Sequence, residues 1–232
     1  DIISNNLANA NTTGYKKEST VKESFPEMVI QKIEGNNREE IGELGTGVRI
    51  EQSYTDFSMG NKKRTGNPLD LAIKGDGFFA VETPTGRKYT RNGNFTLNRD
   101  DQIVTQQGYP VLGENGQPIQ TIEGRNVNID QSGQVYLGEL EADSFQIVDF
   151  ANREDLVKNG ENLFTYNGEQ ADIQQAEEFQ LLQGYLEGSN VNTVKEMTKM
   201  IEANRLYQTQ QRVIKKADST LDKAVNQVGR VG

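Results

Sequence analysis

The C-terminal stretch 191–232 constrains the fold of this chain more than any other part of the sequence. It contains no Pro or Gly between Thr193 and Val228, and Gly229 follows as a stop signal. Thr193 and Glu196 have the spacing of a capping box, in which each side chain satisfies the other residue's backbone N–H. A helix over this stretch would be about 54 Å long at 1.5 Å per residue, far longer than an ordinary globular helix.

The apolar residues of the predicted helix form two half-stripes on opposite faces. The first half-stripe consists of Val194, Met197 and Ile201. Arg205, Gln208, Arg212, Lys215 and Ser219 continue its line with polar side chains. The second half-stripe begins on the far side and consists of Leu206, Val213, Ala217, Leu221, Ala224 and Val228. A helix packed on one core shows a single stripe, so we predict different neighbours for the two halves. The alternative is a terminal helix folded back on its own domain.

Composition excludes several classes of function. The chain has 232 residues, a net charge of −9 and no basic run, which argues against a nucleic-acid surface. No apolar stretch approaches a membrane span, and no basic, apolar signal peptide is present. Because the chain has no Cys, His or Trp, disulfides, thiol chemistry, His-based acid–base catalysis and the usual zinc ligands are excluded. We therefore expect no cofactor and no metal.

The N-terminal region predicts a helix end, a second short helix and a strand. Ile3 and Leu7 lie on one helical seam, and Gly14 can end the helix in the left-handed conformation. Apolar residues recur at helical spacing over 19–34, which predicts a short amphipathic helix there. The period changes to two over 48–57 and predicts a strand.

Between Asn67 and Phe164 the pattern is that of β-structure throughout. Alternating apolar residues are separated by the hairpin-type turn dipeptides Asn92-Gly93, Asn115-Gly116 and Ser132-Gly133. The fold class that we predict is a mainly β body domain, either an antiparallel sandwich or a distorted barrel, with α-helical terminal segments that include a long C-terminal helix.

We divide the chain into three parts. Residues 1–65 form the N-terminal helix end, the Asn-rich motif and an extended linker, 66–185 form the β-rich body, and 186–232 form an assembly helix. Gly184 and Gly188 flank the joint between body and helix, and we predict a hinge there.

The acidic residues do not form the pattern of a catalytic site. Asp100 and Asp101 lie in a predicted turn, where Asp bonds to nearby backbone groups. Asp70 alternates with apolar residues and is expected to face water. The stretch beginning at Asp130 resembles a calcium loop only superficially, because Val135 stands where the sharp turn needs Gly. We predict no catalytic residues.

Long motifs at both ends resemble those of one known family. NNLANANTTGYKK looks like the N-terminal signature of the bacterial flagellar axial proteins, the rod and hook family. EGSNVNTVKEMTKMIEANRLYQTQQRVIKKADSTLDKAV is similar to that family's C-terminal signature. TGNPLDLAIKGDGFFAV, KYTRNGNF, QGYPVLGENGQPI and SFQIVDFANREDLVKNGENLF resemble its body motifs. The body lacks the large inserted domains of hook proteins, which favours a rod-type member, most like the distal rod protein and its paralogues.

The resemblance implies a structural subunit of the basal-body rod. In that family the terminal helices pair and build the inner tube of a drive shaft that carries torque to the hook. Here the helix that precedes the Asn-rich motif is mostly missing from the sequence, so we expect an incomplete pairing partner for the C-terminal helix. The predicted assembly interface comprises Ile3, Leu7, Val194, Met197, Ile201, Leu206, Val213, Ala217, Leu221 and Val228.

The resemblance also implies the partners and the location. The partners are copies of the chain, other axial proteins of the rod and hook, and the flagellar export apparatus, with no nucleic acid and no membrane insertion. The location is the extracytoplasmic part of the basal body, reached without a cleavable signal peptide. The alternatives are a hook-type or proximal-rod subunit of the same family, or a cell-wall hydrolase or sugar-binding β-domain.

Overall fold

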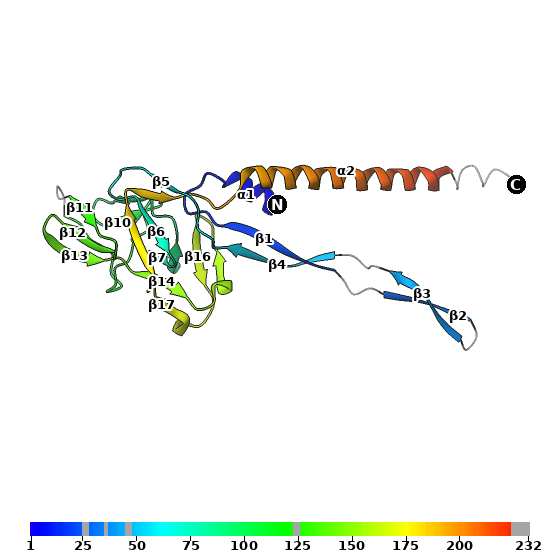
Figure 1. Ribbon diagram of the computed structural model, residues 1–232, viewed down its shortest axis with the longest axis horizontal. Helices are drawn as coiled ribbons and strands as arrows, with labels where there is room; N and C mark the ends of the chain where they lie inside the picture. Colours follow the sequence, from blue (N-terminus) through cyan, green and yellow to red (C-terminus); the bar gives the residue numbers. More distant parts are fainter. Residues whose placement is uncertain (25–27, 35–36, 45–47, 123–125, 224–232) are drawn as a thin grey trace. The chain divides into compact units, whose positions relative to one another are not determined.

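The computed structural model describes residues 1–24, 28–34, 37–44, 48–122 and 126–223 (Figure 1). The chain divides into two compact units, one made of Asp1–Ala10 with the residues from Val191 onward and one made of Asn11–Asn190. The second unit reaches beyond the predicted body 66–185 at both ends, because segments on either side of that range pair with each other.

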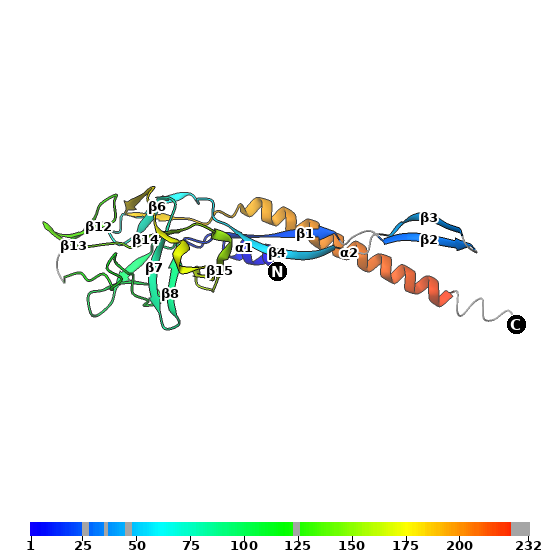
Figure 2. The ribbon, with the colours of Figure 1, turned by 90° about the horizontal axis from the view of Figure 1, so that it is seen from below.

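The helical unit contains α1 (Ile2–Ala8) and α2 (Thr193–Lys223), which lie against each other. α2 is one continuous helix in both views (Figures 1 and 2). The predicted capping box is wrong, because Thr193 is already helical. Instead the Asn192 side chain accepts a hydrogen bond from the Lys195 N–H at 3.0 Å. Residues 224–228 of the predicted helix lie outside the described part of the chain.

The first four strands of the second unit form two antiparallel ribbons. They are β1 (Lys17–Ser24), β2 (Met28–Glu34), β3 (Asn37–Leu44) and β4 (Val48–Asp56), and β1 pairs with β4 while β2 pairs with β3. The strand predicted over 48–57 is confirmed. The helix predicted over 19–34 is wrong, because pairing with a partner strand overrides the helical spacing of its apolar residues.

The remaining strands build the body. They are β5 (Lys62–Arg64), β6 (Leu71–Gly75), β7 (Phe78–Thr83), β8 (Gly86–Thr90), β9 (Phe95–Leu97), β10 (Ile103–Thr105), β11 (Val127–Ile129), β12 (Gln134–Leu137), β13 (Leu140–Ser144), β14 (Ile147–Phe150), β15 (Leu156–Lys158), β16 (Leu163–Tyr166), β17 (Ile173–Gln175), β18 (Phe179–Gln183) and β19 (Tyr185–Glu187). Two 3₁₀ turns, η1 (Arg153–Asp155) and η2 (Gln170–Asp172), interrupt them.

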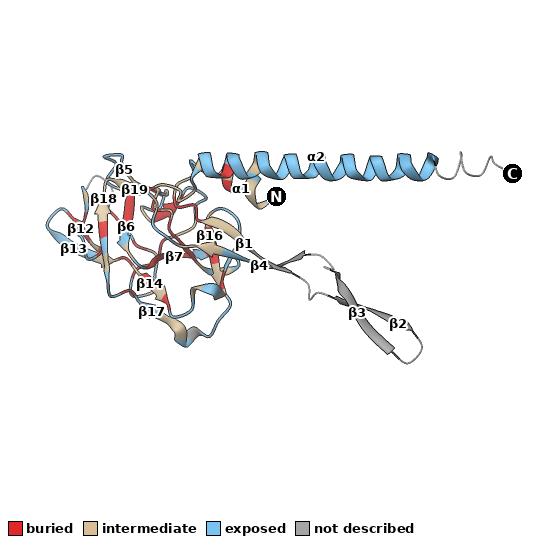
Figure 3. Ribbon diagram, turned by 45° about the vertical axis from the view of Figure 1, so that its right-hand side comes forward, coloured by how far each residue is buried: buried red, intermediate tan, exposed pale blue. Residues whose placement is uncertain are grey.

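The largest sheet has the order β15-β16-β8-β7-β14-β17. Its strand β7 is buried on both faces, since all side chains from Phe78 to Val81 are fully buried. Phe79 packs in one apolar cluster with Phe95 and Phe145, whereas Phe78 packs in another with Phe164. Figure 3 shows the buried residues concentrated in these strands. The predicted mainly β body with helical terminal segments is confirmed.

The turn predictions are partly right. Ser132-Gly133 joins the antiparallel strands β11 and β12, and Gly116 makes a turn with a positive φ of 74°. Asn92-Gly93 is not a hairpin, because β8 and β9 belong to different sheets. Gly93 instead lets the backbone approach Leu71, whose N–H donates to the Gly93 carbonyl at 2.9 Å.

Asp70 does not face water as predicted. Its side chain is buried, and its Oδ1 accepts hydrogen bonds from Asn94 Nδ2 at 2.8 Å and from Asn67 Nδ2 at 3.3 Å. These amide donors satisfy the carboxylate that the apolar alternation brings into the body.

Candidate functional site

The two ends of the second unit meet at a buried group of three charged residues, which we call the clasp. Lys16 lies just before β1, Arg91 follows β8, and Glu187 ends β19. All three side chains are at most 1% exposed. Because charged side chains are rarely buried without a partner, their position together indicates a specific structural role.

Glu187 is the centre of the clasp. Its Oε1 lies 2.7 Å from Lys16 Nζ and accepts a hydrogen bond from the Gly60 N–H at 2.8 Å. Its Oε2 lies 3.7 Å from Arg91 NH1. Lys16 Nζ also donates to the Ser58 carbonyl at 2.8 Å. The carboxylate therefore joins the entry of the chain into the body to its exit.

Burial disfavours the charged forms of Lys16 and Arg91, the two cations of the clasp. It lowers the pKa of the Lys16 ammonium, and the Glu187 carboxylate opposes that shift. Burial likewise lowers the pKa of the Arg91 guanidinium, which lies 5.0 Å above the ring of Phe78 and donates to the Gly75 carbonyl at 3.0 Å. Two cations share one carboxylate, so the clasp depends strongly on the negative charge of Glu187.

The two residues before Lys16, Gly14 and Tyr15, pack inside the body. Gly14 has a φ of 67°, and its N–H donates to the Glu187 carbonyl at 2.8 Å. A Cβ at this position would lie 2.5 Å from the backbone nitrogen of Asn92. Tyr15 is buried, with Lys158 Nζ at 3.6 Å from its ring centroid. Both the backbone conformation and the close approach of Asn92 therefore disfavour a side chain at position 14, and the end of the Asn-rich motif is fixed within the body.

The predicted hinge residues lie in hydrogen-bonded backbone. The Gly184 N–H donates to the Asp70 carbonyl at 2.8 Å, and its own carbonyl accepts from the Thr65 N–H at 2.8 Å. The Gly188 N–H donates to the Asn61 carbonyl at 2.8 Å. The contacts of both glycines within the second unit are therefore specific, and a hinge at these positions stays a prediction.

Asn190 is the last residue of the second unit, and its side chain contacts two strands. Its Oδ1 accepts from the Lys17 N–H at 2.8 Å, and its Nδ2 donates to the Asp56 carbonyl at 2.7 Å. One amide side chain therefore bridges β1 and the end of β4. Neither Asn190 nor the clasp was among the residues predicted from the sequence.

The predicted assembly residues lie on the two helices. Ile3 and Leu7 are half-buried on α1. Those on the described part of α2 are all exposed, and the large ones expose between 51% and 71% of their surface: Val194, Met197, Ile201, Leu206, Val213, Ala217 and Leu221. Val228 lies outside the described residues. Figure 3 shows most of α2 exposed. A run of large apolar side chains exposed on one helix is typical of an interaction surface.

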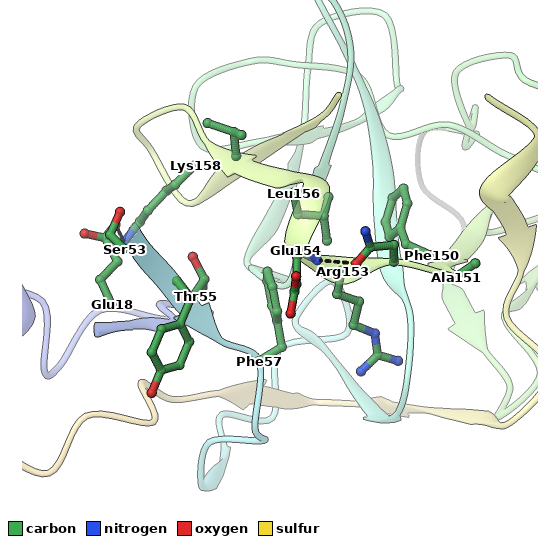
Figure 4. Close-up of a pocket in the computed structure, with 13 residues that line it drawn as sticks. Glu18, Ser53, Thr55, Phe57, Phe150, Ala151, Arg153, Glu154, Leu156 and Lys158 are labelled. Carbon is green, nitrogen blue, oxygen red and sulfur yellow. Dashed lines mark hydrogen bonds and ion pairs between the residues drawn. The ribbon is translucent and has the colours of Figure 1, made fainter. Parts of the chain in front are cut away.

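A groove in the second unit has a volume of about 870 Å³ and lies between β4, η1 and β15 (Figure 4). Two carboxylates, those of Glu18 and Glu154, line it. Glu18 is paired with Lys158 at 3.2 Å, whereas Glu154 is exposed. Arg153, on the same groove, is paired with Asp149 at 2.9 Å.

Two further features bear on the class of protein. In the residues that the structure describes, no group of three or more potential ligands is placed to hold a metal ion. Within the same residues, no helix combines the length and the apolar character needed to cross a membrane.

Three family descriptions match this chain. Residues 182–228 match "Flagellar basal body rod FlgEFG protein C-terminal", residues 72–137 match "Flagellar hook protein FlgE/F/G D1 domain", and residues 1–16 match "Flagella basal body rod protein". The first and last of these contain Glu187 and Lys16, the two residues paired in the clasp.

Several curated proteins are similar over almost their full length. The flagellar basal-body rod protein FlgF of Caulobacter vibrioides is 36% identical, with 100% of this chain and 91% of the relative covered. The flagellar basal-body rod protein FlgG of Bacillus subtilis is 35% identical, with 97% and 92% covered. The flagellar hook-basal body complex protein FlhO of the same organism is 32% identical, with 100% and 93% covered.

Proposed function

Because this chain belongs to the flagellar basal-body rod protein family, we propose that it polymerises through its terminal helices into a tube that transmits torque to the hook. Its function is that of a structural subunit of the basal-body rod. The proposal adds the mode of assembly and the mechanical role. The family is one of structural proteins, and we expect this chain to have no enzymatic activity.

The exposed apolar surface of α2 carries the proposal. Leu206, Val213 and Leu221 each expose more than 60% of their surface. Burying such a side chain contributes about 1.5–3 kcal/mol, so three together approach the net stability of a small domain, about 5–15 kcal/mol. Association that buries this surface therefore lowers the free energy of the subunit substantially. A contact that repeats without closing produces a filament.

The clasp supports the mechanical part of the proposal. Within one subunit, the terminal helices are joined to the β body by the segments that enter and leave it. Lys16 and Glu187 lie on those two segments and are joined by a buried ion pair. We infer that the clasp fixes both segments to the body, so that a force applied at either end acts on the body as a whole.

Partners and location follow from the family. The partners that we propose are copies of the chain, the other axial proteins of the rod and hook, and the flagellar export apparatus. Within the flagellar basal body we place the subunit in the extracytoplasmic part, exported without a cleavable signal peptide. A distal position in the rod is our preferred assignment.

Hydrogen exchange of the full chain tests the assembly mode. In dilute solution the α2 amides should exchange much faster than those of β7, which is buried on both faces. At concentrations where sedimentation shows polymers, exchange of α2 should slow while that of β7 stays unchanged. Equal protection of α2 and β7 in the dilute monomer would contradict the proposal, as would polymers in which α2 remains unprotected.

A further inference from the structure

α2 carries a stripe of four cations in addition to its apolar residues. At about 100° per residue these four side chains lie within about 40° of one another and extend over about 27 Å of helix. The basic stripe lies about a third of a turn from the second apolar half-stripe. Its members, all exposed, are Arg205, Arg212, Lys216 and Lys223.

The basic stripe is not neutralised within its own helix. In the part of the chain that the structure describes, none of its four members forms an ion pair. Arg212 NH2 donates only to the neutral Thr209 hydroxyl at 3.2 Å. Like charges aligned on one helix face repel one another. An anionic surface placed along the stripe would therefore be attracted over its whole length.

The body of this chain carries the opposite net charge. Residues 11–190 contain 29 Asp and Glu against 17 Lys and Arg, whereas Thr193–Lys223 contains 7 Lys and Arg against 4 Asp and Glu. The chain is thus divided into an acidic body and a basic helix. Between Glu154 and Glu178 there are seven acidic residues and a single cation, Lys158, which is already paired with Glu18.

We propose that the basic stripe docks on the acidic body of a second copy of this chain. The proposal rests on the proposed function, because a second copy is held beside the stripe only in a polymer. Charge complementarity favours a second copy as the binding partner, because the body carries a large excess of negative charge. It therefore repels other bodies and attracts the basic stripe. The carboxylates that we assign to the contact are those between Glu154 and Glu178.

The arrangement on α2 lets one helix serve two neighbours. The second apolar half-stripe packs against a neighbouring helix, and the basic stripe, a third of a turn away, faces a neighbouring body. Apolar burial then supplies most of the stability, whereas the charges supply register and sensitivity to salt. Both contacts use side chains that are exposed in the single subunit.

Zero-length carbodiimide cross-linking tests this contact, since it joins a lysine to a carboxylate only when the two touch. Full-length chain is prepared with normal and with ¹⁵N label, mixed in equal amounts, polymerised and cross-linked. Mass spectrometry should find mixed-isotope peptides that join Lys216 or Lys223 to a carboxylate between Glu154 and Glu178. Lys215 is the internal control, because it adjoins Lys216 in sequence but lies about 80° around the helix from the centre of the stripe, and it should give far fewer links.

Other cross-linking results would overturn the proposal. Links from Lys216 and Lys223 only to Asp218 or Asp222 of other copies would assign the stripe to helix–helix pairing. Links confined to one copy, or polymers with no link from these lysines, would also overturn it. A chain that forms no polymer at any concentration would overturn the proposed function itself, and sedimentation before cross-linking detects that outcome separately.

Charge reversal gives a second readout. Arg212→Glu should raise the concentration for half-maximal assembly by about tenfold at low salt, and the difference from wild type should shrink as salt rises. Gln211→Glu introduces the same acidic side chain next to it but off the stripe, with a charge change of one unit instead of two, and should leave assembly unchanged. Arg212→Lys keeps the positive charge and should assemble nearly as well as wild type. Equal assembly of the Arg212→Glu and Gln211→Glu variants would overturn the proposal.

Discussion

Lys16 Nζ lies 2.7 Å from Glu187 Oε1, although 171 positions separate the two residues in the chain. Lys16 belongs to the first of the two terminal motifs, and Glu187 begins the second. The pair is buried, and the same carboxylate faces Arg91. The two terminal motifs therefore meet inside the body of this chain.

Removing the charge of Glu187 should destabilise the body strongly. Glu187→Gln keeps the shape of the side chain but leaves Lys16 and Arg91 as buried cations without a carboxylate. Breaking a buried pair in this way costs about 3–5 kcal/mol. Urea unfolding followed by circular dichroism measures the loss. Glu177→Gln, at an exposed position, is the control and should change stability by less than about 0.5 kcal/mol.

A double-mutant cycle refines this test. Adding Lys16→Met to Glu187→Gln removes one of the two unpaired cations, so the double variant should be more stable than the sum of the single changes predicts. Additive effects would mean that Lys16 and Glu187 do not stabilise the body through each other.

Gly14→Ala should be far more harmful than a glycine substitution at a matched position. Gly14 and Gly160 have nearly the same φ, 67° and 68°, but a Cβ would meet the Asn92 backbone only at Gly14. Gly160→Ala should cost about 1 kcal/mol from the conformation alone. Gly14→Ala should cost at least twice as much. Thermal unfolding compares the two variants, and equal losses would show that the close approach at Gly14 is relieved at little cost.

The body should fold as residues 11–190 rather than as the shorter predicted range 66–185. The shorter fragment lacks Lys16 and Glu187 and with them the clasp. It also lacks the buried ring of Tyr15 and the strand β19 that pairs with β5. The 11–190 fragment should show a cooperative transition at a clearly higher temperature than the 66–185 fragment. Equal transition temperatures would mean that the threaded segments contribute nothing to the body.

Asp130 should contribute stability that is lost in acid. Burial alone would raise the pKa of its carboxyl, but hydrogen bonds from the Ser132 hydroxyl and from the backbone N–H groups of Gln134 and Ser132 outweigh burial and lower the pKa below its usual 3.8. A carboxyl with a lowered folded-state pKa stabilises the protein above its unfolded pKa, and the contribution disappears as pH falls through the folded value.

Asp130→Asn is the matched variant, because it keeps an oxygen acceptor in the turn without a titrating group. Wild type should lose stability relative to Asp130→Asn between about pH 5 and pH 2. Between pH 6 and pH 8 the difference in stability between the two proteins should stay constant. Parallel curves down to pH 2 would show that the hydrogen bonds of Asp130 do not depend on its charge.

The sequence was sufficient to predict those elements whose structure is determined by the spacing of apolar residues or by a local motif. Alternation predicted the β body, and the uninterrupted stretch after Thr193 predicted α2. Its two half-stripes also predicted an interface that includes Leu206 and Leu221, and both side chains are exposed in the structure. These features are local, or they depend only on which face of an element is apolar.

Other features depend on partners that are distant in the chain. Residues 19–34 have helical spacing, yet the partner strands β4 and β3 fix 19–24 and 28–34 as strands. Lys16 lies beside Lys17 in a polar run, and hydropathy cannot distinguish a buried lysine from an exposed one. The glycines next to the clasp, Gly14 and Gly188, were the available signal, because a required Gly indicates close backbone approach.

The most direct test of the assembly surface uses Leu221→Asp with Gln211→Asp as its control. Leu221 and Gln211 are both exposed on α2, and the same charge is added at each, but only Leu221 lies on the apolar half-stripe. A carboxylate there must stay hydrated, so a helix packed against it is displaced.

The measurement is sedimentation of the purified full-length chain over a concentration series, together with its melting temperature and the swimming of cells that carry each variant. We predict that Leu221→Asp abolishes polymers and motility while its melting temperature equals that of wild type, and that Gln211→Asp behaves as wild type in all three. Normal polymers and swimming with Leu221→Asp, or unfolding of the single subunit by that change, would contradict the assignment of α2 as the assembly surface.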